Sequence, residues 1–385
     1  MRVTIVSRIF APEISAAAGL LSSWAREFRD QGHQVTVVTT RPPRGIAISD
    51  PDGIRVRRAP VLRDRQHYVR GYLSYLSFDI PLAFRLLFSR KADLYIVEPP
   101  PTTTAVVRVI AALRRTPYIV DAADLWSDAA VMATKSRLVL RSLRWVERFA
   151  LNGAAWLLVV AQGYADRMRE IGITTPTTTI GFGADTDLFH YRHAPIPNPP
   201  CFIYAGTYSE WHGAEIFIDA FASLLRRVPG ARLRFIGNGQ ERDALTARAL
   251  SLGIADSVEV LPPIPPQDLA PELQEATISL SSLKPGQGYD YAFTTKIFSS
   301  LAAGCPIIFT GVGPTVKFLQ EASNRDAGVA VPYDVGTVAD AMLQAAQAPL
   351  APESRRLLSE WVVSKYSLSA IAKLVVRTSL EAIGR

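Results

Sequence analysis

The stretch GQGYDYAFTTKIFSSLAAGCPIIFT, residues 286–310, places a loop, a short helix and a buried strand in quick succession. Thr294 or Thr295 is a suitable N-cap for the helix, and Gly304 ends it shortly before an apolar run. We therefore predict a helix that starts at one of these threonines, followed by a strand over Pro306–Thr310. A helix leading into a buried strand is typical of a parallel α/β sheet.

The start of this helix is a candidate anion site. A helix N-terminus carries free N–H groups and a partial positive charge. Lys296, which we expect in the first turn, adds a full charge. One hypothesis is that the loop and helix hold the phosphates of a sugar nucleotide. The alternative is an ordinary loop capped by threonine, with Lys296 in solvent.

Working outward, strand-like apolar runs alternate with helix-length segments along the whole chain, which predicts parallel sheets built from βα units. The expected strands of a first sheet are Val3–Ser7, Gln34–Thr39, Ile54–Arg58, Leu94–Val97, Tyr118–Asp121 and Trp156–Val160. Those of a second sheet are Cys201–Ala205, Arg232–Ile236, Val258–Leu261, Pro306–Thr310 and Val329–Val331. Ligands of such sheets bind beyond the carboxyl ends of the strands.

The proline-rich segment HYRHAPIPNPP, residues 190–200, marks a boundary between two domains, because prolines cannot continue a helix or a central strand. We predict a first domain over residues 1–193 and a second over residues 194–366. The periodic apolar segment 367–385 is expected to form a helix that crosses back onto the first domain. The fold class is therefore α/β, with two Rossmann-like domains facing a cleft.

Charge is divided unevenly along the chain. Residues 1–195 carry 26 Lys and Arg against 17 Asp and Glu, a net charge of +9, and the remainder carries 16 against 18, a net charge of −2. The positive charge of the first half therefore indicates an anionic partner. No nucleic-acid recognition motif is present, and an anionic membrane surface fits the mixture of basic and apolar residues better.

Two basic, apolar segments are the candidates for such a surface. Residues 68–91 read as a helix pair broken at Pro81, and residues 135–149 as a basic amphipathic helix. For both segments, packing of the helices onto the sheet is the alternative.

Cysteine and histidine usage points to neither a disulfide nor a metal site. Cys201 and Cys305 lie in apolar runs, as small buried hydrophobic residues do in a reducing compartment. His190 and His193 lie in the proline-rich segment, without zinc-ligand spacing. A strand begins almost directly after Met1, and no apolar run reaches the length of a membrane span, so we expect a cytoplasmic protein at the inner face of the membrane.

Several motifs in order carry a resemblance to a known family. FIYAGTYSEWHGAEIFIDAFASLL (202–225), the segment 233–280 and TTKIFSSLAAGCPIIFTGVG (294–313) resemble the nucleotide-sugar domain of retaining glycosyltransferases of family four, which have the GT-B fold. QGHQVTVVTT (31–40) and GFGADTDLF (181–189) agree with the first half of the family. VDAADLWSDAAV (120–131) is similar to the DLWP-type segment of members that build capsule, exopolysaccharide and O-antigen units.

The resemblance implies transfer of a sugar from a nucleotide donor, expected to be a UDP-sugar, with retention at the anomeric carbon and without a metal or other cofactor. The acceptor is expected to be a lipid-linked compound or a glycan. Donor-binding positions carried over from the family, or proposed beside them, are Gly206, Thr207, His212, Gly237, Pro263, Ile264, Tyr289, Asp290, Phe293, Thr294, Thr295, Lys296 and Ser299.

The sequence departs from the family at four charged positions. The glutamate pair of the family falls at Tyr291 and Ser299, and Ser299 can offer the donor ribose only a neutral hydrogen bond. The phosphate-binding Arg and Lys fall at Thr207 and His212. A protonated His212 would restore part of that charge. In the DLWP-type segment, the position often held by histidine is Ala123.

Candidates for catalysis lie in the first domain. Asp124, just beyond a strand end, is a candidate base for the acceptor hydroxyl, with a role as helix N-cap as its alternative. Glu98, at a neighbouring strand end, competes for the same role. Arg8 would supply charge to the phosphates from the opposite wall of the cleft, and Glu13 and Ser15 would contact donor or acceptor.

Two other functions remain open at this point. Loss of both family glutamates favours a catalytically weakened GT-B protein that acts as the partner of an active transferase. A different sugar-nucleotide enzyme of similar fold, such as an epimerase, is the third hypothesis.

Overall fold

The chain forms two compact units. The computed structural model describes residues 1–13, 15–43, 47–48, 50–63, 69, 71–123, 125–134 and 136–384, without the side chains of residues 16, 72, 129 and 131–133. The first unit consists of Met1–Gly181 together with Leu368–Arg385, and the second of Phe182–Ser367. The predicted boundary between residues 193 and 194 therefore lies inside the second unit, and the C-terminal helix belongs to the first.

The first unit is built on a parallel sheet with strand order β3-β2-β1-β4-β5-β6-β7. Each neighbouring pair is parallel, as in the register Val3↔Val35 between β1 and β2. Its strands are β1 (Arg2–Val6), β2 (Gln34–Thr40), β3 (Ile54–Ala59), β4 (Leu94–Val97), β5 (Tyr118–Ala122), β6 (Trp156–Val159) and β7 (Thr177–Thr179).

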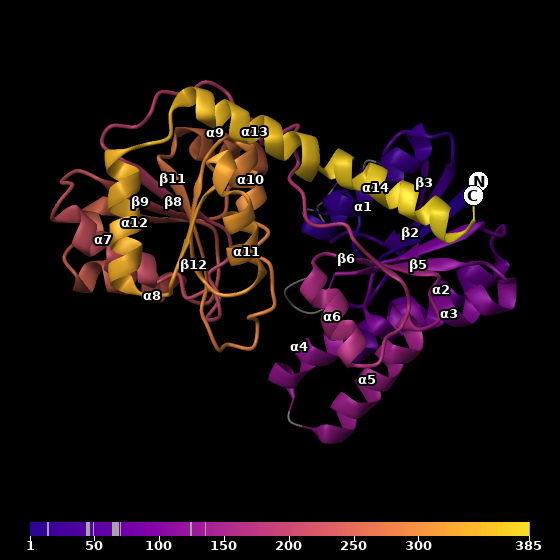
Figure 1. The fold of residues 1–385 in the computed structure, drawn as a ribbon. Coiled ribbons are helices and arrows are strands. Elements are labelled where there is room, and N and C mark those ends of the chain that lie inside the picture. The colour runs from indigo at the N-terminus through magenta and orange to yellow at the C-terminus, as the bar shows by residue number, and fades with distance from the viewer. Residues whose placement is uncertain are drawn as a thin grey trace. The chain divides into compact units, whose positions relative to one another are not determined.

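Helices cover both faces of this sheet (Figure 1). On one face, α1 and the C-terminal helix α14 bury side chains such as Trp24, Phe28 and Val375 against the strands. On the other face lie α2, α3 and α5. The helices of this unit are α1 (Ala16–Asp30), α2 (Tyr72–Phe88), α3 (Pro101–Arg114), α4 (Trp126–Ala133), α5 (Arg137–Leu151), α6 (Gln162–Glu170) and α14 (Leu368–Ala382).

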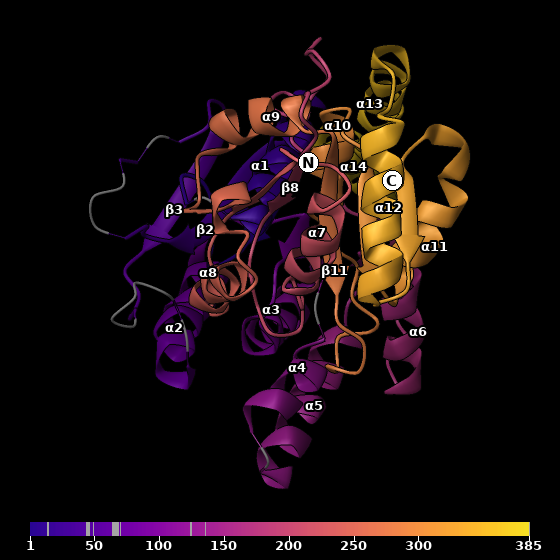
Figure 2. The same ribbon diagram turned by 90° about the vertical axis from the view of Figure 1, so that its left-hand side faces the viewer.

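The second unit repeats the same arrangement, with strand order β10-β9-β8-β11-β12-β13 and parallel neighbours. Alternate residues of β8 point to opposite faces: Tyr204 packs with α7, α8 and α12, and Ile203 with α9, α10, α11 and α13. Figure 2 shows α7 beside α12 on the first of these faces. The elements are β8 (Cys201–Ala205), α7 (Ile216–Leu225), β9 (Arg232–Ile236), α8 (Arg242–Ser251), β10 (Val258–Leu261), α9 (Pro266–Glu275), β11 (Ile278–Leu283), α10 (Ile297–Ala302), β12 (Ile307–Gly311), α11 (Pro314–Glu321), β13 (Gly328–Val331), α12 (Val335–Gln347) and α13 (Pro352–Tyr366), with short 3₁₀ turns at Ala255–Ser257 and Ser323–Arg325.

Both sheets therefore have the doubly wound order, which confirms the predicted fold class. In such a sheet the strand order reverses at one point, and a ligand crevice lies beyond the carboxyl ends there. The reversal falls between β1 and β4 in the first unit and between β8 and β11 in the second. The segments after these four strands are thus the natural candidates for functional residues.

Two predicted elements need correction. The helix expected from Thr294 or Thr295 begins at Ile297, and Lys296 is its N-cap residue without a side-chain capping bond. The expected helix pair is one continuous helix, α2, with Pro81 inside it. A proline removes one backbone hydrogen bond, but Phe78 and Leu82 are fully buried on either side of it and hold the helix on the core.

Two strands, β7 and β11, had not been predicted. In β11 every residue is buried although three of its six are serine, so its composition lacks the apolar signal of a central strand. The sequence of β7 is three threonines at the edge of the sheet. Among the helices that the structure describes, none has both the length and the apolar composition of a membrane span.

Candidate functional site

The carboxyl edge of the first sheet brings Ser7 and Glu98 together. Ser7 directly follows β1 and Glu98 directly follows β4, the two strands that flank the reversal of strand order. The Ser7 hydroxyl donates to Glu98 Oε2 at 3.0 Å, and the backbone N–H of Glu98 donates to the Val6 carbonyl at 2.9 Å. Glu98 is partly exposed. A carboxylate at the expected ligand crevice is thus held in place and open to solvent.

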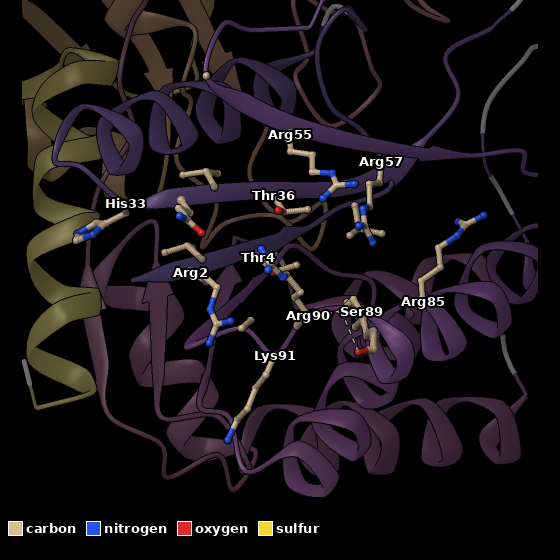
Figure 3. Close-up of a pocket in the computed structure, with 17 residues that line it drawn as sticks. Arg2, Thr4, His33, Thr36, Arg55, Arg57, Arg85, Ser89, Arg90 and Lys91 are labelled. Atoms are coloured by element: carbon tan, nitrogen blue, oxygen red, sulfur yellow. Dashed lines mark hydrogen bonds between the residues drawn. The ribbon is translucent and has the colours of Figure 1, made fainter.

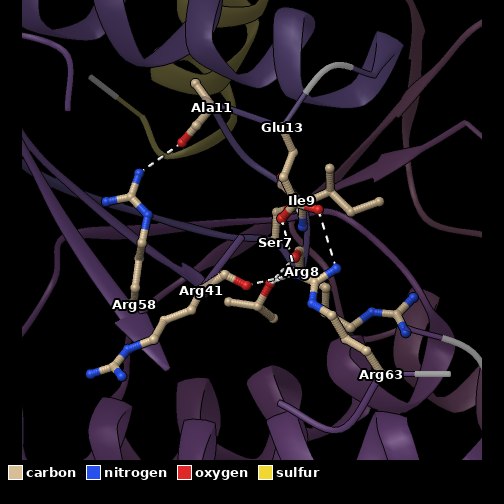
Figure 4. Close-up of polar contacts among 9 residues, drawn as sticks. Ser7, Arg8, Ile9, Ala11, Glu13, Arg41, Arg58 and Arg63 are labelled. Carbon is tan, nitrogen blue, oxygen red and sulfur yellow. Dashed lines mark hydrogen bonds and ion pairs between the residues drawn. The ribbon is translucent and has the colours of Figure 1, made fainter. Parts of the chain in front are cut away.

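The loop after β1 is fixed by arginines from the neighbouring edge of the sheet (Figure 4). Arg63 binds both carboxylate oxygens of Glu13, at 3.2 and 3.3 Å, and also donates to the Arg41 carbonyl. Arg58 donates to the Ala11 carbonyl at 2.7 Å. A largely buried bidentate pair of this kind sets geometry, so Glu13 supports the loop in this structure.

Ser15 has a local structural role. Its hydroxyl oxygen accepts a hydrogen bond from the Ala18 N–H at 3.1 Å and caps the N-terminus of α1. A contact of the Ser15 side chain with a substrate, as predicted from the sequence, would compete with this capping bond.

Arg8 lies at the same edge in an unusual environment. Its side chain is 7% exposed, and its guanidinium carbon lies 4.1 Å from the Tyr75 ring centroid and 6.0 Å from that of Trp126. Within the described part of the chain, its Nε and Nη1 are buried without a hydrogen-bond partner. Buried charged donors ordinarily have partners. The guanidinium also interacts electrostatically with the buried Asp79, whose pKa it lowers against the effect of burial.

Asp124 lies outside the described residues, and the structure places only its neighbours. The N–H groups of Trp126 and Ser127 donate to the Glu147 carboxylate at 2.8 and 3.3 Å. Burial raises the pKa of Glu147 above its ordinary value, and the hydrogen bonds from these residues oppose the shift. Glu147, on α5, thus binds the N–H groups at the start of α4. We had not identified Glu147 from the sequence.

In the second unit, Lys296 lies against the end of β8. Its Nζ donates to the Tyr204 hydroxyl at 2.6 Å and lies 4.2 Å from the ring centroid. The Tyr204 hydroxyl donates in turn to the Thr207 carbonyl at 3.2 Å. Desolvation lowers the pKa of Lys296 to about 7. Lys296 therefore does not carry the expected full positive charge at pH 7, because its ammonium group titrates near neutrality.

Two glycines make close backbone packing possible beside Lys296. Gly237 follows β9 with φ +155, and a Cβ added to it would lie 1.8 Å from the Gly206 carbonyl oxygen. A Cβ on Gly206 (φ +144) would lie 3.2 Å from the Lys296 Nζ. Both positions thus require glycine. The loops after β8 and β9 therefore contact each other at the carboxyl edge. Without side chains at these two positions, a ligand can approach the backbone closely.

His212 does not supply the missing charge. Burial, with a smaller contribution from the nearby Lys296 charge, lowers the pKa of His212 to about 3. Its Nδ1 accepts a hydrogen bond from the Ser209 N–H at 3.3 Å. His212 is therefore neutral at pH 7, and the expectation that it replaces the lysine of the family as a cation is wrong.

Three aromatic and acidic candidates around the loop are already engaged in contacts. Phe293 packs its ring against Phe182, Phe298 and Phe318, at centroid distances of 5.4 to 5.5 Å. Only the backbone of Phe293 thus remains a donor-site candidate. Tyr289 lies 5.0 Å from the Trp211 ring, and the exposed Asp290 accepts from the Gly286 N–H.

The other candidates differ in exposure. Thr294 is buried and its N–H donates to the Thr315 hydroxyl, while Thr295 is exposed. Ser299 lies partly exposed in α10, and Tyr291, at the other position of the family glutamates, is partly exposed as well. Thr207, Pro263 and Ile264 follow β8 and β10 at the same carboxyl edge, the first two exposed and the third partly buried.

The structure adds a second lysine to this edge. Lys284 directly follows β11, at the reversal of strand order, and its Nζ pairs with Glu215 at 3.3 Å. Tyr333 donates to the Gly213 carbonyl at 2.7 Å beside them. Lys284 escaped sequence reasoning because β11 itself was not predicted. Among the described residues, no group of three or more His, Cys, Asp or Glu side chains converges as a metal site would require.

Solved structures with the same architecture define the class. The chain superposes on a sucrose-phosphate synthase from Thermosynechococcus elongatus with a TM-score of 0.74 and 17% identity, over 99% of this chain and 98% of the other. It superposes on HepE of Anabaena, solved in complex with UDP, with a TM-score of 0.71 and 15% identity, over 98% and 99% of the two chains. The fold is that of the GT-B glycosyltransferases.

Sequence comparison gives the family. Residues 20–183 match the "Glycosyl transferase 4-like domain" and residues 199–348 match "Glycosyl transferases group 1". A D-inositol 3-phosphate glycosyltransferase of Nocardia farcinica is 32% identical over 124 residues, 30% of this chain and 26% of that protein. The chain spans well under half the length of the curated relatives it matches. With both domains present, the chain belongs to the GT-B glycosyltransferase family that its sequence resembles.

Proposed function

We propose that the protein transfers a sugar from a UDP-sugar, with retention of anomeric configuration, to a lipid-linked or glycan acceptor in cell-envelope polysaccharide or glycolipid synthesis. In this reaction the bond from the anomeric carbon to the diphosphate breaks, and a bond to the acceptor oxygen forms. The diphosphate leaves as UDP, and the acceptor hydroxyl loses its proton. The DLWP-type segment at residues 120–131 supports the envelope role.

The observation that carries this proposal is the position of Lys296. Its ammonium lies on Tyr204 at the carboxyl edge of the second sheet, next to two glycines that bring backbone close to the same space. Charge that develops on a leaving diphosphate is stabilised by such fixed donors. HepE, a structure of the same fold, is described in complexes with UDP, UDP-glucose and UDP with glucose. We assign the donor diphosphate to Lys296 and the backbone of Phe293–Thr295.

In the first unit, we assign roles in the transfer to Glu98 and Arg8. Glu98 is a partly exposed carboxylate at the ligand edge and serves in this proposal as the base for the acceptor hydroxyl. Asp124, which follows the next strand in the sheet, remains the second candidate for that role. Arg8 has unused buried N–H donors and supplies positive charge to the phosphates.

We propose that the reaction needs no metal ion, with Lys296 meeting the charge of the diphosphate. We also propose a cytoplasmic location at the inner face of the membrane. Exposed apolar side chains on α2 and α5, including Phe84, Phe88 and Trp145, support contact with a lipid surface.

The test uses the purified full-length chain. A thermal-shift screen with UDP, GDP, dTDP, ADP and their sugars should show stabilisation by UDP and one UDP-sugar, because a ligand that binds the folded state raises its stability. With that donor and a membrane-derived acceptor, UDP should then be released, in EDTA as in buffer. Lys296→Ala should abolish the UDP shift, while Lys317→Ala, an exposed lysine on α11, should keep it. Failure of every nucleotide to shift the melting temperature would contradict the proposal.

A second candidate is a catalytically weakened partner of an active transferase. It is favoured by Tyr291 and Ser299 at the positions of the family glutamates and by the neutral His212. In that case no nucleotide binds in calorimetry and another transferase co-purifies with the chain. Release of UDP by the chain alone, with donor and acceptor, eliminates this candidate.

A further inference from the structure

The first unit contains a basic cavity whose lining includes none of the candidate residues at the carboxyl edge of the sheet. The cavity has a volume of about 330 Å³ and is lined by the first residues of β1 and β2, by β3, and by the end of α2 with the loop that follows it. Alternate residues of β1 and β2, namely Arg2, Thr4, Thr36 and Val38, line the cavity, whereas Ser7 and Glu98 follow the carboxyl ends of β1 and β4. The cavity is therefore separate from the candidate transfer site.

The lining carries more positive charge than the ion pair of Arg2 compensates. Figure 3 shows Arg55 and Arg57 extending from β3 and Arg90 extending from the loop after α2 toward the same space. Arg85 and Lys91 lie beside them, and no Asp or Glu is among the described residues of the lining. Arg2 pairs with Asp93 at 3.6 Å.

The remaining arginines have no carboxylate partner among the residues that the structure describes. In the described part of the chain, no ion pair joins Arg55, Arg57, Arg85 or Arg90 to a carboxylate. The Nη1 atom of Arg85 is buried without a hydrogen-bond partner among the same residues. Like charges gathered around a cavity repel one another unless an anion lies between them. The cavity thus has the chemistry of a site for a phosphate-bearing ligand.

An exposed apolar stripe begins at the rim of this cavity. It consists of α2 side chains with exposed fractions from 38% to 79%, namely Leu73, Leu76, Ile80, Phe84, Leu87 and Phe88. These residues recur every three or four positions and so share one face of the helix. Arg85 and Phe88 are three residues apart and neighbour each other on the helix surface. Cationic and apolar surfaces are therefore continuous, as an amphipathic ligand requires.

We propose that this cavity binds the phosphate head group of an anionic lipid while the α2 stripe contacts the acyl region of the membrane. The proposal rests on the membrane association proposed above and names the residues that provide it. The ligand is a lipid and not free phosphate, because only a lipid uses both the arginines and the adjoining stripe.

The experiment is flotation of the full-length protein with phosphatidylcholine vesicles, with and without phosphatidylglycerol. Arg55→Gln with Arg57→Gln removes two cavity charges and breaks no side-chain hydrogen bond to any residue that the structure describes. The matched control, Arg26→Gln with Arg377→Gln, removes two exposed charges from α1 and α14 on the opposite face. We expect the cavity variant to bind anionic vesicles roughly thirtyfold more weakly and the control to bind within a fewfold of wild type.

Two further arms identify the source of the phosphate. Phe84→Ser with Phe88→Ser should lower binding to anionic vesicles although it leaves all charges in place. Inorganic phosphate should displace wild-type protein from vesicles no better than sodium chloride of equal ionic strength. Preferential displacement by phosphate, or unchanged binding of the phenylalanine variant, would overturn the lipid assignment.

The remaining outcomes separate this proposal from the transferase function. Equal losses in the cavity variant and the control variant, or no loss in either, would overturn the cavity as a lipid site. A UDP thermal shift that is the same in wild type and the cavity variant, together with weakened vesicle binding, supports the proposal and shows that the donor site is intact.

Discussion

Lys296 and Tyr204 are 92 residues apart in the chain, yet the lysine ammonium donates a 2.6 Å hydrogen bond to the tyrosine hydroxyl. Burial raises the pKa of Tyr204, so its hydroxyl keeps its proton and donates it to the Thr207 carbonyl. The lysine is thereby held at the end of β8 in an environment that lowers its pKa to about 7. Both donor binding and stability should respond to this arrangement.

Donor affinity should fall as pH rises above 7. The free protein has Lys296 half-protonated near pH 7, and a bound diphosphate stabilises the ammonium, so binding takes up a proton above that pH. The UDP affinity should therefore decrease by up to about tenfold per pH unit between pH 7 and 9. Calorimetric titrations of UDP at several pH values check this. The slope should vanish in Lys296→Met and persist in Lys317→Met; an equal slope in both would contradict the assignment.

Stability should change in the opposite sense over the same range. The pKa of Lys296 is lower in the folded chain than in the unfolded chain, which therefore binds more protons between pH 7 and about 10.4. The free energy of unfolding gains a contribution that rises with pH across this window. Urea denaturation of wild type and Lys296→Met should show a difference that narrows as the pH increases from 7 to 9.5. A constant difference would mean that Lys296 is not desolvated.

Arg8→Met should lower activity without unfolding the protein. The guanidinium has buried nitrogens without hydrogen-bond partners in the described part of the chain, so its loss breaks no such bond there. Loss of a positioned charge at the site should reduce kcat/KM by roughly 100-fold or more. Arg8→Lys keeps the charge but loses the planar contact with Tyr75. Its kcat/KM should therefore lie between that of wild type and that of Arg8→Met. Steady-state kinetics together with melting curves measure both effects; a collapsed melting curve for Arg8→Met would show a structural role instead.

Gly237→Ala should disrupt the carboxyl edge of the second sheet. Its Cβ would lie 1.8 Å from the Gly206 carbonyl oxygen at a φ of +155, so the two loops must move apart. We expect a loss of about 2–4 kcal/mol in the free energy of unfolding and a weaker UDP shift. Gly163→Ala is the control, because that glycine lies in α6 with no atom within 4 Å of an added Cβ. Equal stability of the two variants would rule out the close contact.

Glu147 should make stability depend on pH in the acidic range. Its pKa is raised in the folded chain, chiefly by burial. The resulting stabilisation is complete below the unfolded pKa near 4.5 and is lost as pH rises through the folded pKa. Glu147→Gln should remove this part of the pH profile and keep an acceptor for the Trp126 N–H. Denaturation curves from pH 4 to pH 7 measure it, and an unaltered profile in the variant would contradict the burial argument.

Local sequence predicts the strands well, and long-range contacts decide most of the site. Leu94–Val97, Cys201–Ala205, Arg232–Ile236 and Val258–Leu261 have their predicted bounds. The first two are apolar runs, and the last two alternate apolar with charged residues. In β11, serines interrupt the apolar run, and burial comes from its neighbours β8 and β12. A strand whose burial is imposed by tertiary contacts leaves a weak trace in composition.

The same division applies to the functional residues. Glu98 and Arg8 are predictable from chain order, since each follows a strand that ends at the ligand edge. The pairing of Glu13 with Arg63 joins residues 50 positions apart, and the altered pKa values of Lys296 and His212 arise from burial. Neither this ion pair nor these pKa changes have a signal in the local sequence. Sequence therefore places these candidates at the carboxyl edges of the two sheets, and the fold determines which of their side chains are already engaged in contacts.

The first unit is discontinuous in the chain, because α14 completes its core after the whole second unit has passed. During synthesis, residues 182–367 form a contiguous segment that is available to fold before Val375 and Val376 leave the ribosome. The core of the first unit, in contrast, is incomplete until α14 has been synthesised, because Trp24 and Phe28 of α1 belong to the same cluster as those valines. Nascent chains that stop before residue 368 thus expose an apolar groove on the first unit. A separate peptide of residues 368–385 should bind such a fragment and complete the core of the first unit.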